Sequence, residues 1–411
     1  MASKNLKFQF ELPGRFRMVS LVLMVIGALT LIIGLLIYGT GEHANRFWGP
    51  LLYNSLYFLM ICNSAMFFIC ATTLAMGGWQ TTFRRVPEAI SSVVPYLGGF
   101  AFIVLMIIVF GSGKNWHLYE WTNSAAVAES HELKGKSAFL NPTFFTIWTI
   151  LIIGIWSILG YKMRQLSFRL DKEGPLPVEA GRKYIFTNTV WASLFMVWFV
   201  LSVMSTAPWL WLMSIDAKWF STMYSWYTFG STFVAGCALI TLLFVYLKNQ
   251  GYLELSNEEH LHNMGLFMFA FSIFWTYLWF DQFMLIWYAN IPEETIYFKQ
   301  RLQGVYAPIF WINLIINFLA PFLIFMRRST KRNYTIVTFM AALLLFGHWL
   351  DFYQMVMPSL FPTEVHLGLI DFGLALGFLG FIMFISGRTL SRHPLIPKYH
   401  PFLKESIIHH T

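Results

Sequence analysis

The chain alternates between long apolar stretches and short polar connections. The apolar stretches cover residues 18–40, 50–75, 92–112, 143–162, 184–206, 223–247, 262–290, 304–326, 334–358 and 366–387. Each reaches the roughly 20 residues that an α-helix needs to cross a bilayer, and several are longer, which favours tilted helices. The pattern therefore predicts an all-α polytopic membrane protein with about ten transmembrane helices.

The polar connections are too short to hold a separate globular domain. The longest run over residues 113–142 and 163–183. We therefore expect residues 1–411 to form a single membrane domain that ends in a polar tail at 388–411. Small residues recur at helical spacing in Gly373, Gly377 and Gly380 and in the segment GSTFVAG at 230–236. This spacing favours close packing between helices.

Composition and charge agree with this interpretation. Hydrophobic residues make up 57% of the chain and charged residues only 12%, whereas about a quarter of a soluble domain is charged. Most of the 28 Lys and Arg residues lie in the two terminal tails and in the connections after every second stretch. By the positive-inside rule, both termini are cytoplasmic.

The net charge of +8 therefore reflects cytoplasmic loops that face anionic lipid. No soluble stretch is long enough to form a nucleic-acid-binding domain, so nucleic acid is not expected as a partner. The first apolar stretch has no following small-residue cleavage site, and we interpret it as a retained span.

Four titratable side chains lie inside the apolar stretches: Asp281, His348, Asp351 and Asp371. A carboxylate in hydrocarbon costs roughly 2.5 to 3.5 kcal/mol on insertion scales, so such residues usually serve a function. His348 and Asp351 are three residues apart and share a helical face. Tyr277 lies one turn before Asp281 on the seventh stretch. We expect a polar column from mid-membrane to the outer surface, if these faces converge.

An acid that gains and loses a proton at this depth is what a proton relay requires. Because desolvation favours the neutral acid, Asp281, Asp351 and Asp371 are candidates for such a path, with His348 and Tyr277 beside them. The alternative is structural, since a buried Asp can tie helices together or pair with a neighbouring subunit. The sequence alone leaves both interpretations open.

Several chemistries are not expected of this chain. A membrane b-haem needs two facing His ligands, and only His348 lies deep. The three cysteines, Cys62, Cys70 and Cys237, stand singly and show no metal-binding spacing. The deep polar residues of the second to fifth stretches are uncharged. We therefore expect no metal and no redox cofactor bound by this chain itself, although bound lipids are expected.

Four motifs carry a resemblance to a known family. They are WLMSIDAKWFSTMYSWYTFGSTFVAG at 211–236, YLKNQGYL at 246–253, FWTYLWFDQFMLIWYANIPEE at 274–294 and HWLDFYQMVMPS at 348–359. With these motifs and ten spans, the chain resembles the F subunit of bacterial alternative complex III, in the polysulfide-reductase (NrfD-like) family of membrane subunits. The resemblance implies two four-helix bundles at 50–206 and 223–358, flanked by helices at 18–40 and 366–387.

The resemblance also implies a function and partners. Alternative complex III is a respiratory quinol:cytochrome c oxidoreductase of the bacterial inner membrane. It oxidises menaquinol and passes electrons to iron-sulfur clusters and c-type haems in its other subunits. The first bundle here lacks a deep His, Asp or Glu that could take a quinol proton. The resemblance therefore fits a proton-conducting core partner of the homologous quinol-oxidising subunit, in a complex that can also join a terminal oxidase.

Two other functions stay open at this point. A purely structural membrane anchor would equally lack cofactor ligands. A secondary transporter typically shows inverted repeats and helices broken at mid-membrane. Here Pro208, Pro292, Pro321 and Pro358 lie near the ends of the apolar stretches, which disfavours a transporter.

Overall fold

The computed structural model describes residues 7–111 and 116–410, and in them ten helical segments are long and apolar enough to cross a membrane. The segments are α1 (Gly14–Tyr38), α2 (Asn45–Leu74), α3 (Arg85–Ser91) with α4 (Val94–Phe110), α7 (Pro142–Glu173), α8 (Val178–Leu201) with η3 (Ser202–Thr206) and α9 (Ala207–Trp211), α10 (Tyr224–Asn249), α11 (Glu258–Ala289), η5 (Gly304–Tyr306) with α13 (Ala307–Leu314), η6 (Ile315–Leu319) and α14 (Ala320–Phe325), α16 (Tyr334–Leu360), and α17 (Leu369–Arg392). The predicted all-α polytopic fold is confirmed.

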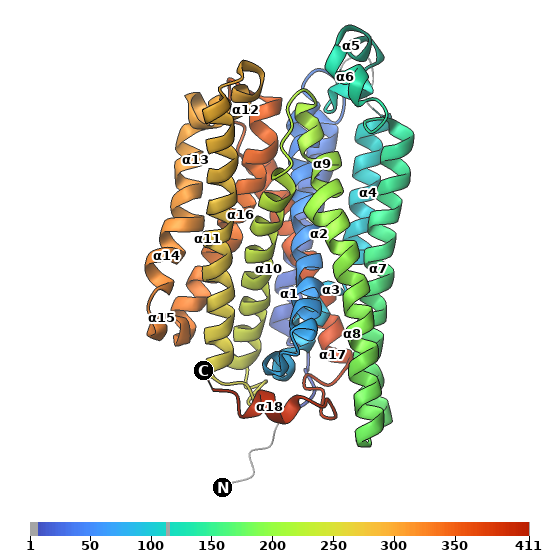
Figure 1. The fold of residues 1–411 in the computed structure, drawn as a ribbon, viewed down its shortest axis with the longest axis vertical. Coiled ribbons are helices and arrows are strands. Elements are labelled where there is room, and N and C mark those ends of the chain that lie inside the picture. The colour runs from blue at the N-terminus through green and yellow to red at the C-terminus, as the bar shows by residue number, and fades with distance from the viewer. Residues whose placement is uncertain (1–6, 112–115, 411) are drawn as a thin grey trace.

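Shorter helices occupy the connections. They are η1 (Gly78–Phe83), η2 (Glu120–Thr122), α5 (Ser124–Glu129), α6 (His131–Lys136), η4 (Met213–Asp216), α12 (Pro292–Leu302), α15 (Arg328–Arg332) and α18 (Leu403–Ile407). In Figure 1, α5, α6 and α12 lie at the top of the bundle, and α18 lies at the bottom. The described residues form no β-strand.

The spanning helices form two groups that meet at α2 and α10. On one side α2, α4, α7 and α8 pack around one another, and on the other α10, α11, α13, α14 and α16 do so (Figure 1). Helix α2 also contacts α10 and α16. In the most apolar part of each helix, 89% of the residues of α2 are buried inside the protein, whereas only 17% of those of α1 are. Helix α2 is therefore the central element, and α1 lies at the periphery.

Helices α1 and α17 form a close pair at the edge of the bundle. A Cβ atom built on Gly27 of α1 would lie 2.3 Å from the Cα of Gly377 on α17. A Cβ on Gly373 would similarly lie 2.2 Å from the hydroxyl oxygen of Thr30. Because only glycine permits this approach, the predicted packing face of α17 is confirmed.

Two spans contain a wide π-helical turn directly before a proline. Proline has no N–H, so it leaves the carbonyl four residues earlier without its helical partner. Pro208 follows η3, and the carbonyl it frees, that of Met204, accepts a hydrogen bond from the Ser225 hydroxyl at 2.8 Å. Pro321 follows η6 in the same way. These turns let the helices continue past proline.

Several helices extend beyond their apolar stretches at the lower end of the bundle. Helix α7 continues to Glu173 and α17 to Arg392, while α8 already begins at Val178. The predicted ends at 162, 387 and 184 fall where basic residues begin. In α7 and α17 buried residues such as Leu170 and Leu390 keep one face of the extension packed, whereas residues 178–183 of α8 are not buried. Both ends of the described chain also meet here, since the Leu395 N–H donates to the Phe8 carbonyl at 2.8 Å.

A candidate site around Asp351

Asp351 of α16 lies at the centre of a polar cluster inside the second helix group. Its side chain is fully buried, and each carboxylate oxygen accepts two hydrogen bonds. Oδ1 accepts from the Tyr227 hydroxyl and from the Asn313 amide at 3.1 Å. Oδ2 accepts from the Ser231 hydroxyl at 2.7 Å and from the Trp275 indole N–H at 2.9 Å. Four donors match the lone pairs of an ionised carboxylate.

The donors come from the three helices that surround α16. Tyr227 and Ser231 are four residues apart and therefore share one face of α10. Trp275 projects from α11 and Asn313 from α13. Asp351 thereby ties four helices together, and it also holds a proton acceptor in an otherwise apolar interior.

His348 joins the cluster one helical turn before Asp351. It is fully buried, and its Nδ1 lies 3.0 Å from the hydroxyl oxygen of Ser231. Because the single hydroxyl hydrogen of Ser231 points to Asp351, His348 must donate from Nδ1 to complete this pair. Its Nε2 has no partner among the described residues. When Asp351 is protonated and His348 carries its own proton on Nε2, the carboxyl group can donate to Ser231 while the Ser231 hydroxyl donates to Nδ1, which moves a proton from Asp351 to His348.

A polar line leads from Asp351 to the end of the bundle opposite the chain termini. A small cavity of about 20 Å³, room for one water, is lined by Asp351, Tyr297 and Arg301. A larger cavity of about 360 Å³ also reaches Tyr297 and is lined by Asp216 and Ser359. Burial raises the pKa of Tyr297 to about 12, so its hydroxyl keeps its proton at neutral pH.

Arg301 lies between these two cavities and is only 5% exposed. Its Nε donates to the Gln354 carbonyl at 2.9 Å, and Nη2 donates to the Met355 carbonyl at 3.2 Å. Nη2 also donates to the Ser359 hydroxyl at 3.0 Å and lies 3.9 Å from an Asp216 carboxylate oxygen. This arginine therefore holds the upper end of α16 and balances a nearby carboxylate.

The structure brings together only two of the predicted site residues, His348 and Asp351. Asp371 is buried at the start of α17, where it accepts from the Tyr53 hydroxyl at 2.7 Å and from the Gly368 N–H at 2.9 Å. No hydrogen bond between described residues joins it to Asp351. Its contacts cap a helix and tie it to α2.

Asp281 and Tyr277 lie on the outward face of α11. Asp281 is partly exposed and makes no hydrogen bond or ion pair with a described residue, and Tyr277 is 60% exposed. The next residue, Gln282, points inward and accepts from the Ser221 hydroxyl at 3.0 Å. The predicted polar column therefore does not form through Asp281 and Tyr277.

The first helix group also contains buried charges, outside the predicted apolar stretches. Arg84, Arg85 and Glu88 are each at most 3% exposed at the lower end of that group. Both arginines donate to the Glu88 carboxylate, at 3.0 and 2.8 Å, and Arg85 also donates to Asp171 at 2.5 Å. The segment RRVPE lies just before an apolar stretch, so counting apolar residues missed that it folds inward.

Sequence reasoning also missed the groups that serve Asp351. Tyr227, Ser231 and Asn313 are ordinary in composition, and Arg301 lies in a connection. The four-residue spacing of Tyr227 and Ser231 was the available signal.

Among the described residues, no three His, Cys, Asp or Glu side chains gather where they could hold a metal ion. The chain matches no protein-family model and no curated protein sequence.

Proposed function

We propose that this chain is a proton-conducting membrane subunit of a respiratory quinol:cytochrome c oxidoreductase of the alternative complex III type. The observation that supports conduction is the Asp351 cluster, with its line of polar groups to one end of the bundle. The motifs at 211–236 and 348–359 support the choice of complex. These motifs contain Tyr227, Ser231, His348 and Asp351.

The proposed partners are a homologous quinol-oxidising membrane subunit and subunits that carry iron-sulfur clusters and c-type haems. Menaquinol, the clusters and the haems belong to those subunits, and the complex would lie in a bacterial inner membrane. The part of this chain is to move protons. A proton that enters from the larger cavity, which Asp216 and Ser359 line, reaches Asp351 past Tyr297 and Tyr227. Ser231 then exchanges it with His348.

The first test is whether haem and iron-sulfur subunits purify with this chain. The second compares proton translocation and quinol oxidation in vesicles that contain the purified complex. We expect Asp351→Asn to lower translocation about tenfold or more while quinol oxidation stays within about twofold, because an amide cannot exchange the proton. Asp281→Asn is the matched control, since that carboxylate faces outward and bonds to no described residue.

A further variant keeps this test informative if Asp351→Asn does not assemble. Ser231→Ala retains the acid and three of its donors but breaks the link to His348. It should therefore slow translocation without loss of assembly. Unchanged translocation in both variants, together with failed assembly of Asp351→Leu, would show instead that Asp351 is a structural hydrogen-bonding residue of a membrane anchor.

A further inference from the structure

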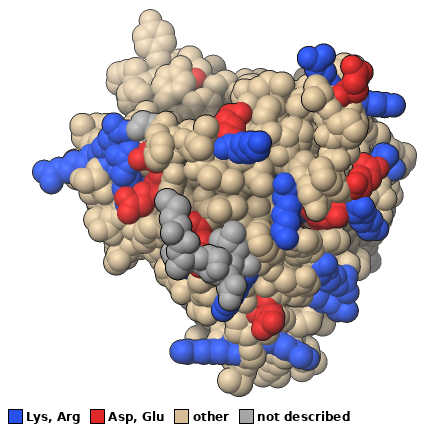
Figure 2. Space-filling view, turned by 90° about the horizontal axis from the view of Figure 1, so that it is seen from below, with Lys and Arg blue, Asp and Glu red and all other residues tan. Residues whose placement is uncertain are grey.

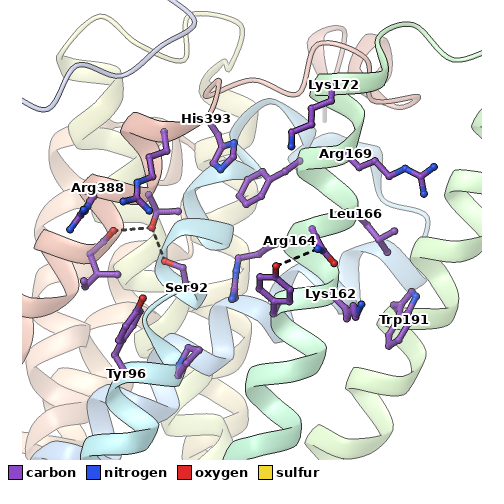
Figure 3. A pocket seen from close by; sticks show the side chains of 17 residues that line it. Ser92, Tyr96, Lys162, Arg164, Leu166, Arg169, Lys172, Trp191, Arg388 and His393 are labelled. Atoms are coloured by element: carbon purple, nitrogen blue, oxygen red, sulfur yellow. Dashed lines mark hydrogen bonds between the residues drawn. The ribbon is translucent and has the colours of Figure 1, made fainter.

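A cleft of about 1050 Å³ opens between α7 and α17 at the end of the bundle where the chain ends meet (Figure 3). Ser92 and Pro95, at the junction of α3 and α4, line it, as does Trp191 of α8. Six Lys and Arg side chains also line the cleft: Lys162, Arg164, Arg169 and Lys172 from α7, and Arg388 and Arg392 from α17. We call it the basic cleft.

Most of the positive charges of the basic cleft have no ion-pair partner among the described residues. None of its lining residues is acidic. Arg169 pairs with Glu173 at 2.5 Å, outside the lining. The side chains of Lys162, Lys172, Arg388 and Arg392 make no ion pair with a described residue. Because like charges at close range repel one another, a bound anion would stabilise this arrangement.

One of these cations is already fixed in place. Arg164 is only 7% exposed, and its Nη1 donates to the carbonyl and hydroxyl of Ser91 at 3.1 and 3.2 Å. Its Nε and Nη2 make no hydrogen bond with a described residue. A guanidinium held in this way presents its remaining N–H groups to an oxyanion with little loss of side-chain entropy.

The surroundings of the cleft favour a lipid over a soluble anion. Tyr96 and Tyr161 line it and are 59% and 55% exposed, and Leu166 and Ile385 contribute apolar surface. The cations lie at the ends of spanning helices, at the level where headgroups meet acyl chains. Figure 2 shows Lys and Arg side chains around much of this end of the bundle. Basic pockets between such helices suit anionic headgroups.

The length of the basic row indicates more than one phosphate. Lys162 and Lys172 are ten residues apart on α7, which corresponds to about 15 Å along the helix. Arg388 of α17 lies across the cleft from them, as Figure 3 shows. We propose that the basic cleft binds the headgroup of an anionic phospholipid with two phosphates, the diphosphatidylglycerol class, between α7 and α17.

This lipid would have a structural consequence. Helix α7 packs on α4 and α8, whereas α17 packs on α1, α2 and α3. A headgroup held by cations of both helices joins the first helix group to the flanking pair. Its two phosphates offset charges that would otherwise push these elements apart.

The test measures thermal unfolding of the delipidated full-length protein as lipid is added. Cardiolipin, which has two phosphates, should raise the melting temperature, and phosphatidylcholine should not. In Arg388→Gln/Arg392→Gln the cardiolipin concentration for half of the effect should rise about 30-fold, given the contribution of each basic residue near a membrane. Arg182→Gln/Lys183→Gln is the matched control, because both side chains are exposed on α8 outside the cleft.

Other outcomes overturn the proposal. Equal stabilisation by phosphatidylcholine, or an unchanged response of the glutamine variant, would show that the cleft does not select anionic lipid. Displacement of cardiolipin by inorganic pyrophosphate at similar concentration would assign the cleft to a soluble phosphate compound. If the glutamine variant does not fold, Arg388→Lys/Arg392→Lys should retain cardiolipin binding, and Lys162→Gln alone should weaken it.

Discussion

Arg301 compensates for a proline near the end of α16, and this pairing can be measured. Pro358 lies inside α16 and has no N–H, so the Gln354 carbonyl four residues earlier lacks its helical donor. The Arg301 Nε donates to that carbonyl at 2.9 Å. Arg301→Met keeps much of the side-chain length but removes every donor. The carbonyl is then buried without a partner.

The expected magnitude follows from these contacts. An unpaired buried acceptor costs about 1–3 kcal/mol, and loss of an ion pair with a partly exposed partner adds up to about 1 kcal/mol. Asp216 is 27% exposed and keeps its bond from the Ser359 hydroxyl, so we expect Arg301→Met to lower the free energy of unfolding by about 2–4 kcal/mol. Pro358→Ala restores an N–H opposite Gln354. It should therefore recover about 1–2 kcal/mol in the Arg301→Met background.

The assay is a double-mutant cycle on the free energy of unfolding in detergent. Pro358→Ala alone should change stability little, because Arg301 already serves the Gln354 carbonyl. Pro208→Ala is the matched control, since the carbonyl freed by that proline is paired with Ser225 instead. Additivity of Arg301→Met and Pro358→Ala within about 0.5 kcal/mol would refute the reasoning.

Two further predictions concern packing and pH. Gly377→Leu should destabilise the protein by about 1–3 kcal/mol or more, because the new leucine side chain would meet the Gly27 backbone. Gly154→Ala is the control and should be neutral in thermal unfolding, because the space around Gly154 is open. Burial, with Arg84 and Arg85 nearby, holds the pKa of His400 well below its usual range. The stability that the neutral ring contributes is therefore present above about pH 6.5 and lost as pH falls. His400→Gln should flatten this decline in melting temperature. An equal decline in both proteins would contradict the prediction.

The sequence predicted the spans well but not their ends or their inward faces. Hydrophobic stretches locate a helix in a bilayer because its length and apolarity are the dominant constraints there. They do not show that α7 continues to Glu173, since beyond residue 162 the helix is held by one packed face and not by overall apolarity. The basic cleft lies on this extension, so hydropathy alone could not reveal it.

The site was predictable only in part for a related reason. His348 and Asp351 belong to one helix, so their spacing of three residues places them together. Asp281 sits on a helix whose inward face is set by tertiary packing, and there Gln282 turns inward instead. Tyr227 and Asn313 reach Asp351 from separate helices. No local pattern in the sequence specifies such a meeting.

The contact between Arg301 and Asp216 also bears on the proposed proton path. An unpaired arginine beside a polar passage repels protons and other cations. Here the guanidinium lies 3.9 Å from the Asp216 carboxylate, between the larger cavity lined by Asp216 and the small cavity at Asp351. The two opposite charges offset each other along the line that a proton would follow. The arginine can therefore support the proline-containing end of α16 while the way to Asp351 stays electrically neutral, as the proposed function requires.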